Sequence, residues 1–221
     1  MWGTPLKKED QAMQIFPTEE KKLKARISAY KSALKREKAK FGCYSDGSGK
    51  RYSLFVLFFA LGDLRKLEEY MDFFQENFPD DMGEPGQQFC WALGLNRMGR
   101  DAEAEFRLAE LMLSNLYLIP QILKREIEEY DMWHSSNWQH IDYIEYIPTE
   151  LIDTFTEEDL AWAEEKYDSF QFAGIRKQHI ELYAALDKTK GVEERGKILK
   201  KARTLLKPLE RNAANKLVQR T

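Results

Sequence analysis

Two of the chain's three histidines and two of its five tryptophans fall within residues 131–140. His134 precedes Ser135 and Ser136, and Asp131 is near, so the segment contains the residue types of a nucleophilic triad. A triad requires the nucleophile and the base to meet in space, with a third group that orients the base. The sequence has no G-x-S-x-G turn and no strand to carry one. We therefore expect no hydrolytic activity.

Metal and phosphate sites follow their own spacing rules, which this sequence does not meet. Cys43 and Cys90 lie far apart, and no C-x-x-C or H-E-x-x-H pattern is present, so neither a metal nor a cofactor is expected. The run that ends in GSGK at Lys50 has Tyr44 where a Walker loop needs glycine. It has Arg51 where that loop needs Ser or Thr. We predict a turn between helices there, and a protein that is not an enzyme.

The two tryptophans of the segment have two interpretations. Trp133 and Trp138 lie in a polar stretch without helical periodicity, where they either anchor the segment or contact a partner. Five residues apart on a helix, they would point about 140° away from each other. We therefore expect one anchor and one contact. The residues predicted to line a partner-binding site are Trp133, His134, Asn137 and Trp138, with Asp46, Lys50 and Arg51 from the other irregular loop.

Charge is distributed unevenly along the chain, whose formal net charge is −3. Residues 18–51 carry eleven Lys/Arg and four Asp/Glu, and residues 193–221 carry nine and three. Residues 52–192 carry twelve and twenty-eight. An acidic body of this size repels a phosphate backbone, so nucleic-acid binding is not expected. We expect the basic first helix to dock on the acidic body or on a second copy, which would make a homo-oligomer.

The sequence also contains signals that bear on the cellular location of the protein. The longest apolar run, residues 54–61, has eight residues and is too short to span a bilayer. The first sixteen residues lack the apolar region of a signal peptide. Two distant cysteines do not make a disulfide framework. These features predict a cytoplasmic protein that does not bind membranes.

Helical periodicity begins after a tail at residues 1–17. Residues 18–41 are predicted to form a basic amphipathic helix, followed by a glycine-rich loop. Two helical pairs follow, each with a glycine at its turn. The two turn glycines lie 37 residues apart, a period typical of helical hairpins. The pairs are 51–61 with 64–78 around Gly62, and 87–98 with 102–115 around Gly99.

These pairs resemble tetratricopeptide (TPR) repeats, which are helix–turn–helix modules with a small residue at the turn. Counted from the turn, Ala92 and Ala104 occupy the small positions of the second pair, and Pro79 the closing position of the first. Residues 50–120 are similar to uncharacterised bacterial TPR-containing proteins. The resemblance implies an all-α, TPR-like α-solenoid of stacked antiparallel hairpins, and supplies no reaction.

The helical period is lost after Pro120, and residues 121–155 are predicted to form an irregular, aromatic-rich insertion. Residues 156–221 return to helices and complete a single domain that begins at residue 18.

The C-terminal helices have their own signals. Thr156 begins the first of them in capping-box style, with an apolar stripe that ends at Phe170. Gly174 is predicted to be a bend or hairpin turn. The final basic helix is expected over residues 192–206, before Pro208.

Stacked hairpins offer a curved surface without chemistry of their own. The sequence therefore favours a non-enzymatic helical-repeat scaffold that binds a protein or peptide partner. The alternative is a dedicated regulatory protein of the antitoxin, immunity or inhibitor type. A small-ligand sensor or an enzyme that uses residues 126–150 is a third hypothesis.

Overall fold

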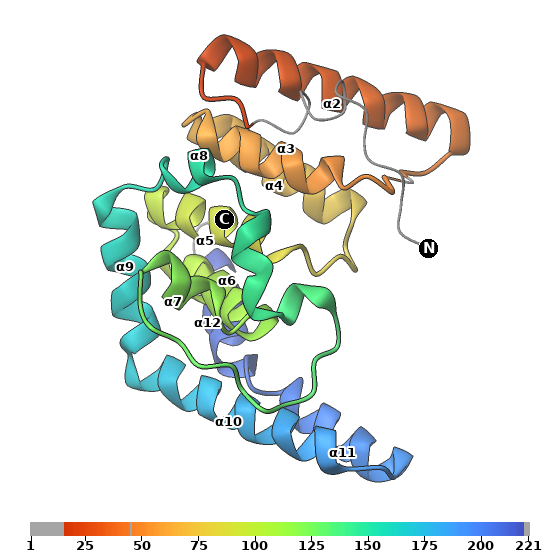
Figure 1. Ribbon diagram of the computed structural model, residues 1–221. Coiled ribbons are helices and arrows are strands. Elements are labelled where there is room, and N and C mark those ends of the chain that lie inside the picture. Colours follow the sequence, from red (N-terminus) through yellow and green to blue (C-terminus); the bar gives the residue numbers. More distant parts are fainter. Residues whose placement is uncertain (1–15, 45, 219–221) are drawn as a thin grey trace.

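The computed structural model describes residues 16–44 and 46–218, and within them the chain forms helices and no strand (Figure 1). This confirms the all-α prediction. Residues 1–15 of the predicted tail lie outside the described residues. No helix in the described ranges combines the length and the apolar character needed to cross a lipid bilayer. The helices are α2 (Glu20–Phe41), α3 (Lys50–Ala60), α4 (Leu64–Asn77), α5 (Pro85–Arg97), α6 (Asp101–Ser114), α7 (Leu118–Ile122), the 3₁₀ helices η1 (Asn137–Gln139) and η2 (Ile141–Tyr146), α8 (Thr149–Ile152), α9 (Glu157–Asp168), α10 (Phe170–Lys188), α11 (Val192–Ala202) and α12 (Lys207–Val218).

The predicted basic helix is α2, which lies across one end of the molecule and packs on α3 (Figure 1). Its buried side chains are Leu23, Ile27 and Leu34, which recur at helical spacing. Gly42 ends the helix in the left-handed conformation, with φ of 74°, and donates its N–H to the Lys38 carbonyl. The helix therefore docks on its own chain through a narrow apolar stripe, and its lysines are exposed.

The two predicted helical pairs are present as α3–α4 and α5–α6. Gly62 and Gly99 turn the chain with φ of 72° and 67°, a region that glycine adopts without steric cost. Each donates its N–H over 2.9 Å to the carbonyl three residues earlier. Helices α3 and α4 both contact α5, so the two pairs lie side by side.

The core is centred on α5, in which residues 85–95 are all buried. Gly94 permits the close approach of α4, because a Cβ there would lie 2.6 Å from Leu67 Cδ2. Six phenylalanines of α3, α4 and α5 lie in or against this core, and of these Phe73 is half-buried. The others are buried: Phe55, Phe58, Phe59, Phe74 and Phe89.

The predicted capping box starts α9. Thr156 Oγ1 accepts the N–H of Asp159 over 3.2 Å, and the Asp159 carboxylate accepts the N–H of Thr156 over 2.9 Å. The same buried carboxylate accepts a hydrogen bond from Arg97 Nε over 3.0 Å. One carboxylate therefore closes the cap and ties α9 to α5.

The structure corrects three predictions for the C-terminal helices. Phe170 does not belong to the stripe of α9, because Ser169 ends that helix and caps α10, and the Phe170 side chain is 96% exposed. Gly174 is not a bend, since α10 runs through it. Helix α11 ends at Ala202, and Pro208 stands in the first turn of a further helix, α12, which packs on α6. Proline fits there because first-turn N–H groups have no helical partner.

Candidate functional site

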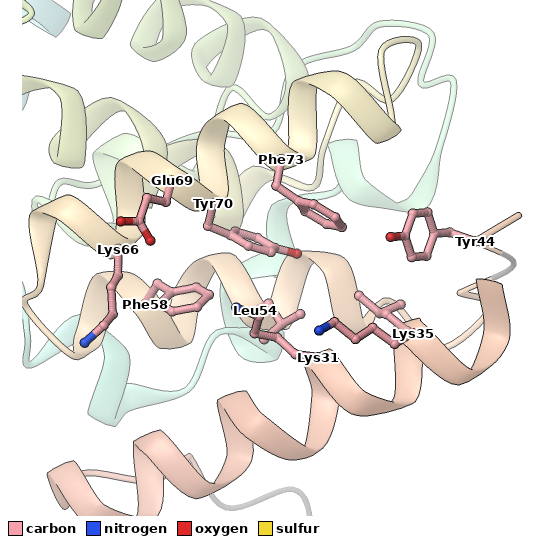
Figure 2. A pocket seen from close by; sticks show the side chains of 10 residues that line it. Lys31, Lys35, Tyr44, Leu54, Phe58, Lys66, Glu69, Tyr70 and Phe73 are labelled. Atoms are coloured by element: carbon pink, nitrogen blue, oxygen red, sulfur yellow. The ribbon is translucent and has the colours of Figure 1, made fainter. Parts of the chain in front are cut away.

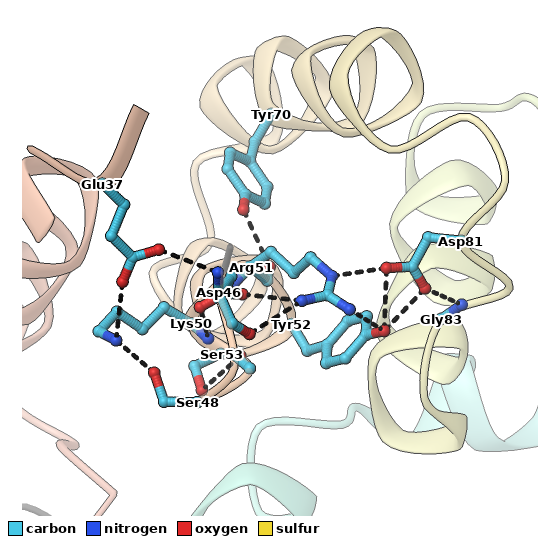
Figure 3. A network of polar contacts seen from close by, with 11 residues as sticks. Glu37, Asp46, Ser48, Lys50, Arg51, Tyr52, Ser53, Tyr70, Asp81 and Gly83 are labelled. Carbon is cyan, nitrogen blue, oxygen red and sulfur yellow. Dashed lines mark hydrogen bonds and ion pairs between the residues drawn. The ribbon is translucent and has the colours of Figure 1, made fainter. Parts of the chain in front are cut away.

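The loop between α2 and α3 is organised around the Asp46 carboxylate, which is only 3% exposed (Figure 3). Its oxygens accept the backbone N–H groups of Lys50 and Arg51 over 2.9 and 2.8 Å. Asp46 in turn donates its own N–H to Glu37 Oε2 over 2.9 Å. A carboxylate at the first turn of a helix satisfies unpaired N–H groups and interacts favourably with the positive end of the helix dipole. Asp46 thus holds α3 in place and does not face solvent.

Arg51 connects this loop to the segment after α4. Its Nη1 donates to Asp46 over 3.1 Å, its Nε to Asp81 over 2.5 Å, and its Nη2 to the Tyr52 hydroxyl over 2.7 Å. The Tyr52 hydroxyl donates to Asp81 over 2.7 Å. Burial acts to raise the pKa of Asp81, but hydrogen bonds from Tyr52, the Gly83 N–H and Arg51 hold that pKa below its usual value. These groups form one internal network, and Lys50 Nζ pairs with Glu37 at its edge.

Trp138 packs against this network. Its ring lies edge-on to Tyr52, with centroids 6.0 Å apart and planes at 86°. The two irregular segments that the sequence singled out therefore meet at Tyr52, to which Arg51 donates a hydrogen bond and against which Trp138 packs.

Side chains from the helical body hold residues 126–150. Asn115, which is 1% exposed, donates to the carbonyls of Trp138 and His140 over 2.6 and 3.1 Å. Gln121 donates to the carbonyl of Ile141 over 2.7 Å. These bonds satisfy backbone groups that have no partner within a regular element. The segment is therefore irregular but fixed.

The two tryptophans have different surroundings. Trp133 is half-buried, with its ring centroid 6.0 Å from Tyr183 and the Arg195 guanidinium 5.4 Å above it. The backbone N–H of Trp133 donates to the backbone carbonyl of Tyr183 over 3.2 Å. Trp138 is 40% exposed. His134 stacks on His140 at 5.2 Å, and its Nε2 is buried without a hydrogen-bond partner among the described residues.

A hollow of about 610 Å³ opens beside Trp138. Two carboxyl groups line it, from Glu84 and Asp142, and the Tyr146 ring at its edge is 80% exposed. The complete lining is Glu84, Asn137, Trp138, His140, Asp142, Tyr143 and Tyr146.

Glu84 is the unusual group in this hollow. Burial raises the pKa of its carboxyl to about 7, opposed by the Arg51 guanidinium and assisted by the Asp81 carboxylate. The side chain precedes α5 but does not cap it. It forms no hydrogen bond or ion pair within the described part of the chain. Tyr143 holds the adjoining wall, since its hydroxyl accepts the Gly86 N–H over 3.2 Å.

The lining combines aromatic faces with two carboxyl groups. Aromatic faces and carboxylates attract organic cations such as ammonium and guanidinium groups. No group of three or more metal-ligating side chains occurs within residues 16–44 and 46–218.

Of the residues predicted from sequence, the structure places Asn137 and Trp138 in the hollow. His134 stacks on His140 of the lining, whereas Trp133 packs on Tyr183 and Arg195. Asp46, Lys50 and Arg51 belong to the internal network of Figure 3. Sequence reasoning missed Glu84, His140, Asp142, Tyr143 and Tyr146. Comparison with protein-family models, curated proteins and solved structures finds no match for this chain.

Proposed function

We propose that the protein is a non-enzymatic, TPR-like binding scaffold that presents the hollow beside Trp138 to a partner protein or peptide. Two observations support the TPR-like arrangement. The α3–α4 and α5–α6 pairs share the same turn geometry at Gly62 and Gly99, and the small residues Ala92 and Ala104 are fully buried within the second pair.

The observation that carries the proposal is the combination of carboxyl groups and exposed rings around one hollow. A lysine or arginine side chain of the partner fits this lining. Its charge would meet Asp142 and Glu84, and its stem would lie against Trp138. A cation–π contact contributes about 0.5–1 kcal/mol at an exposed site and more when it is desolvated. A charge-assisted hydrogen bond adds to that and fixes the orientation.

The test uses blocked amino-acid amides of lysine, arginine and glutamate as probes, added to ¹⁵N-labelled protein. We expect the lysine and arginine probes to shift the Trp138 indole resonance, and the glutamate probe to leave it unchanged. Asp142→Asn should weaken this response. The matched control is Glu145→Gln, an exposed acid on the same η2 helix that does not line the hollow. Equal responses to all three probes, or equal effects of the two variants, would refute the proposal.

A further inference from the structure

A second hollow surface lies between α2 and the α3–α4 pair, on the side shown in Figure 2. Two continuous cavities of about 370 and 380 Å³ form it, and they share Lys31, Lys35, Phe58 and Lys66. Its floor is apolar, and the half-buried side chains of Tyr44, Leu61 and Phe73 provide the accessible part of it. We call this surface the α2–α4 groove.

The rim of the α2–α4 groove is basic. Lys24, Lys31 and Lys35 follow one another at intervals of seven and four residues, which places them within about 40° on one face of α2. Lys66 of α4 stands on the opposite rim (Figure 2). The one acid in the lining, Glu69, lies 3.9 Å from Arg65 Nε.

Two of these lysines lack an anionic partner. Lys24 pairs with Glu20, and Lys66 pairs with Asp63 at 2.8 Å. Lys31 and Lys35 form no ion pair with any residue in the described part of the chain, and both are exposed. Lys31 Nζ lies 5.9 Å from the centroid of the Phe58 ring, above the apolar floor. Uncompensated positive charge thus borders an apolar surface.

We infer that the α2–α4 groove binds an acidic amphipathic helix of a partner protein. The groove is bounded by two helices, and an amphipathic helix can lay its apolar face into such a space. Its acidic flank would meet Lys31 and Lys35. The lysines from 24 to 35 cover about 17 Å of α2, which corresponds to three turns of a bound helix. Acids at the same seven- and four-residue intervals would match the three lysines.

This site differs from the hollow beside Trp138 in both place and charge. The α2–α4 groove favours an anion, whereas the hollow beside Trp138 favours a cation. Neither proposal requires the other. The variant Asp142→Asn should therefore leave helix binding unchanged, and this separates failure of one proposal from failure of the other.

The test measures fluorescence anisotropy of a labelled peptide of about 18 residues, long enough to form helix. It carries glutamates at the three matching positions and leucines on the adjoining face. We expect saturable binding by the full chain that Lys31→Glu with Lys35→Glu weakens by about tenfold or more. The matched control is Lys22→Glu with Lys40→Glu. It makes the same charge change about 160° around α2 from Lys24 and should weaken binding by less than about threefold.

Control peptides test the apolar face and the spacing. A peptide of the same composition in scrambled order, and one with serines in place of the leucines, should both bind more weakly. Equal binding of the scrambled peptide, equal effects of the two double variants, or no binding by folded protein would overturn the inference.

Two other occupants would also overturn it. If a single-stranded RNA of equal charge displaces the peptide and binds more tightly, the groove is a nucleic-acid site. If the wild-type protein sediments as a dimer that Lys31→Glu with Lys35→Glu dissociates, the occupant is a second copy of this chain.

Discussion

The raised pKa of Glu84 makes folding stability depend on pH in a direction that can be worked out. A carboxyl with a folded-state pKa of about 7 holds its proton where the unfolded chain, with an ordinary value of 4.5, has lost it. Between these two pKa values the folded state binds more protons than the unfolded state. The stability that Glu84 contributes is therefore fully present below pH 4.5 and is lost as pH rises to about 7. The difference between 4.5 and about 7 corresponds to about 3 kcal/mol.

Glu84→Gln removes this titration and keeps the shape of the side chain. We expect the variant and the wild type to be about equally stable at pH 4.5, and the variant to be more stable by up to about 3 kcal/mol at pH 8. Urea denaturation at several pH values measures the difference in free energy of unfolding between the variant and the wild type. The other titrating groups are common to both proteins, so their contributions cancel. His140 lines the same hollow, so His140→Gln serves as the control. A difference between Glu84→Gln and wild type that does not change with pH would refute the reasoning.

The same group links pH to ligand binding. A cation in the hollow favours the ionised carboxylate, so its binding should release a proton and tighten as pH rises through 7. Calorimetry with blocked arginine amide in buffers of different ionisation enthalpy counts the proton. In Glu84→Gln the proton release should disappear.

The other predictions concern stability. Trp133→Ala should cost about 2–3 kcal/mol in urea denaturation, since it removes the contacts with Tyr183 and Arg195. Trp138→Ala should cost less than about 1.5 kcal/mol yet weaken partner binding by about 2 kcal/mol; equal stability losses with unchanged binding would make both residues structural. Asp159→Ala should cost about 3–5 kcal/mol, because it leaves the Arg97 charge without its carboxylate, and a loss below 1 kcal/mol would contradict this. Ala104→Leu should lower stability by about 1–3 kcal/mol through overpacking of a fully buried position, and an unchanged melting temperature would count against it.

Local signals explain why most helices could be predicted from the sequence. Gly62 and Gly99 mark turns because their positive φ favours glycine at that position. Thr156 marks a helix start because its hydroxyl caps α9. Each of these signals acts within four residues, so the sequence alone contains it.

Predictions from glycine and proline fail where the surrounding structure decides the role of the residue. Gly174 has no structural neighbour that requires a glycine, and the surrounding helix-forming residues carry α10 through it. From the sequence, Pro208 predicts the end of a helix, although proline also suits a first helical turn. Leu209 and Ala213 of α12 are buried, and α12 packs on α6. This packing stabilises a helix that local sequence signals do not predict.

The candidate site was only partly predictable for the same reason. Trp138 and Asn137 stood out by residue type within one short segment. Glu84 is more than fifty residues away in sequence, and its altered pKa arises from burial that only the fold creates. Asp46 and Arg51 are candidates from the sequence because they follow a glycine-rich loop pattern, yet in the fold both side chains point inward and bond to each other. Residue type identifies candidates, and tertiary contacts decide which of them line the hollow.

The uneven charge along the sequence becomes a division between two surfaces in the fold. Helix α3 lies between them, because Tyr52 near its start supports Trp138 while Phe58 farther along lines the α2–α4 groove. A partner that carries both an acidic helix and a basic side chain would engage the two proposed surfaces at once. It would gain affinity through effective concentration without any new contact.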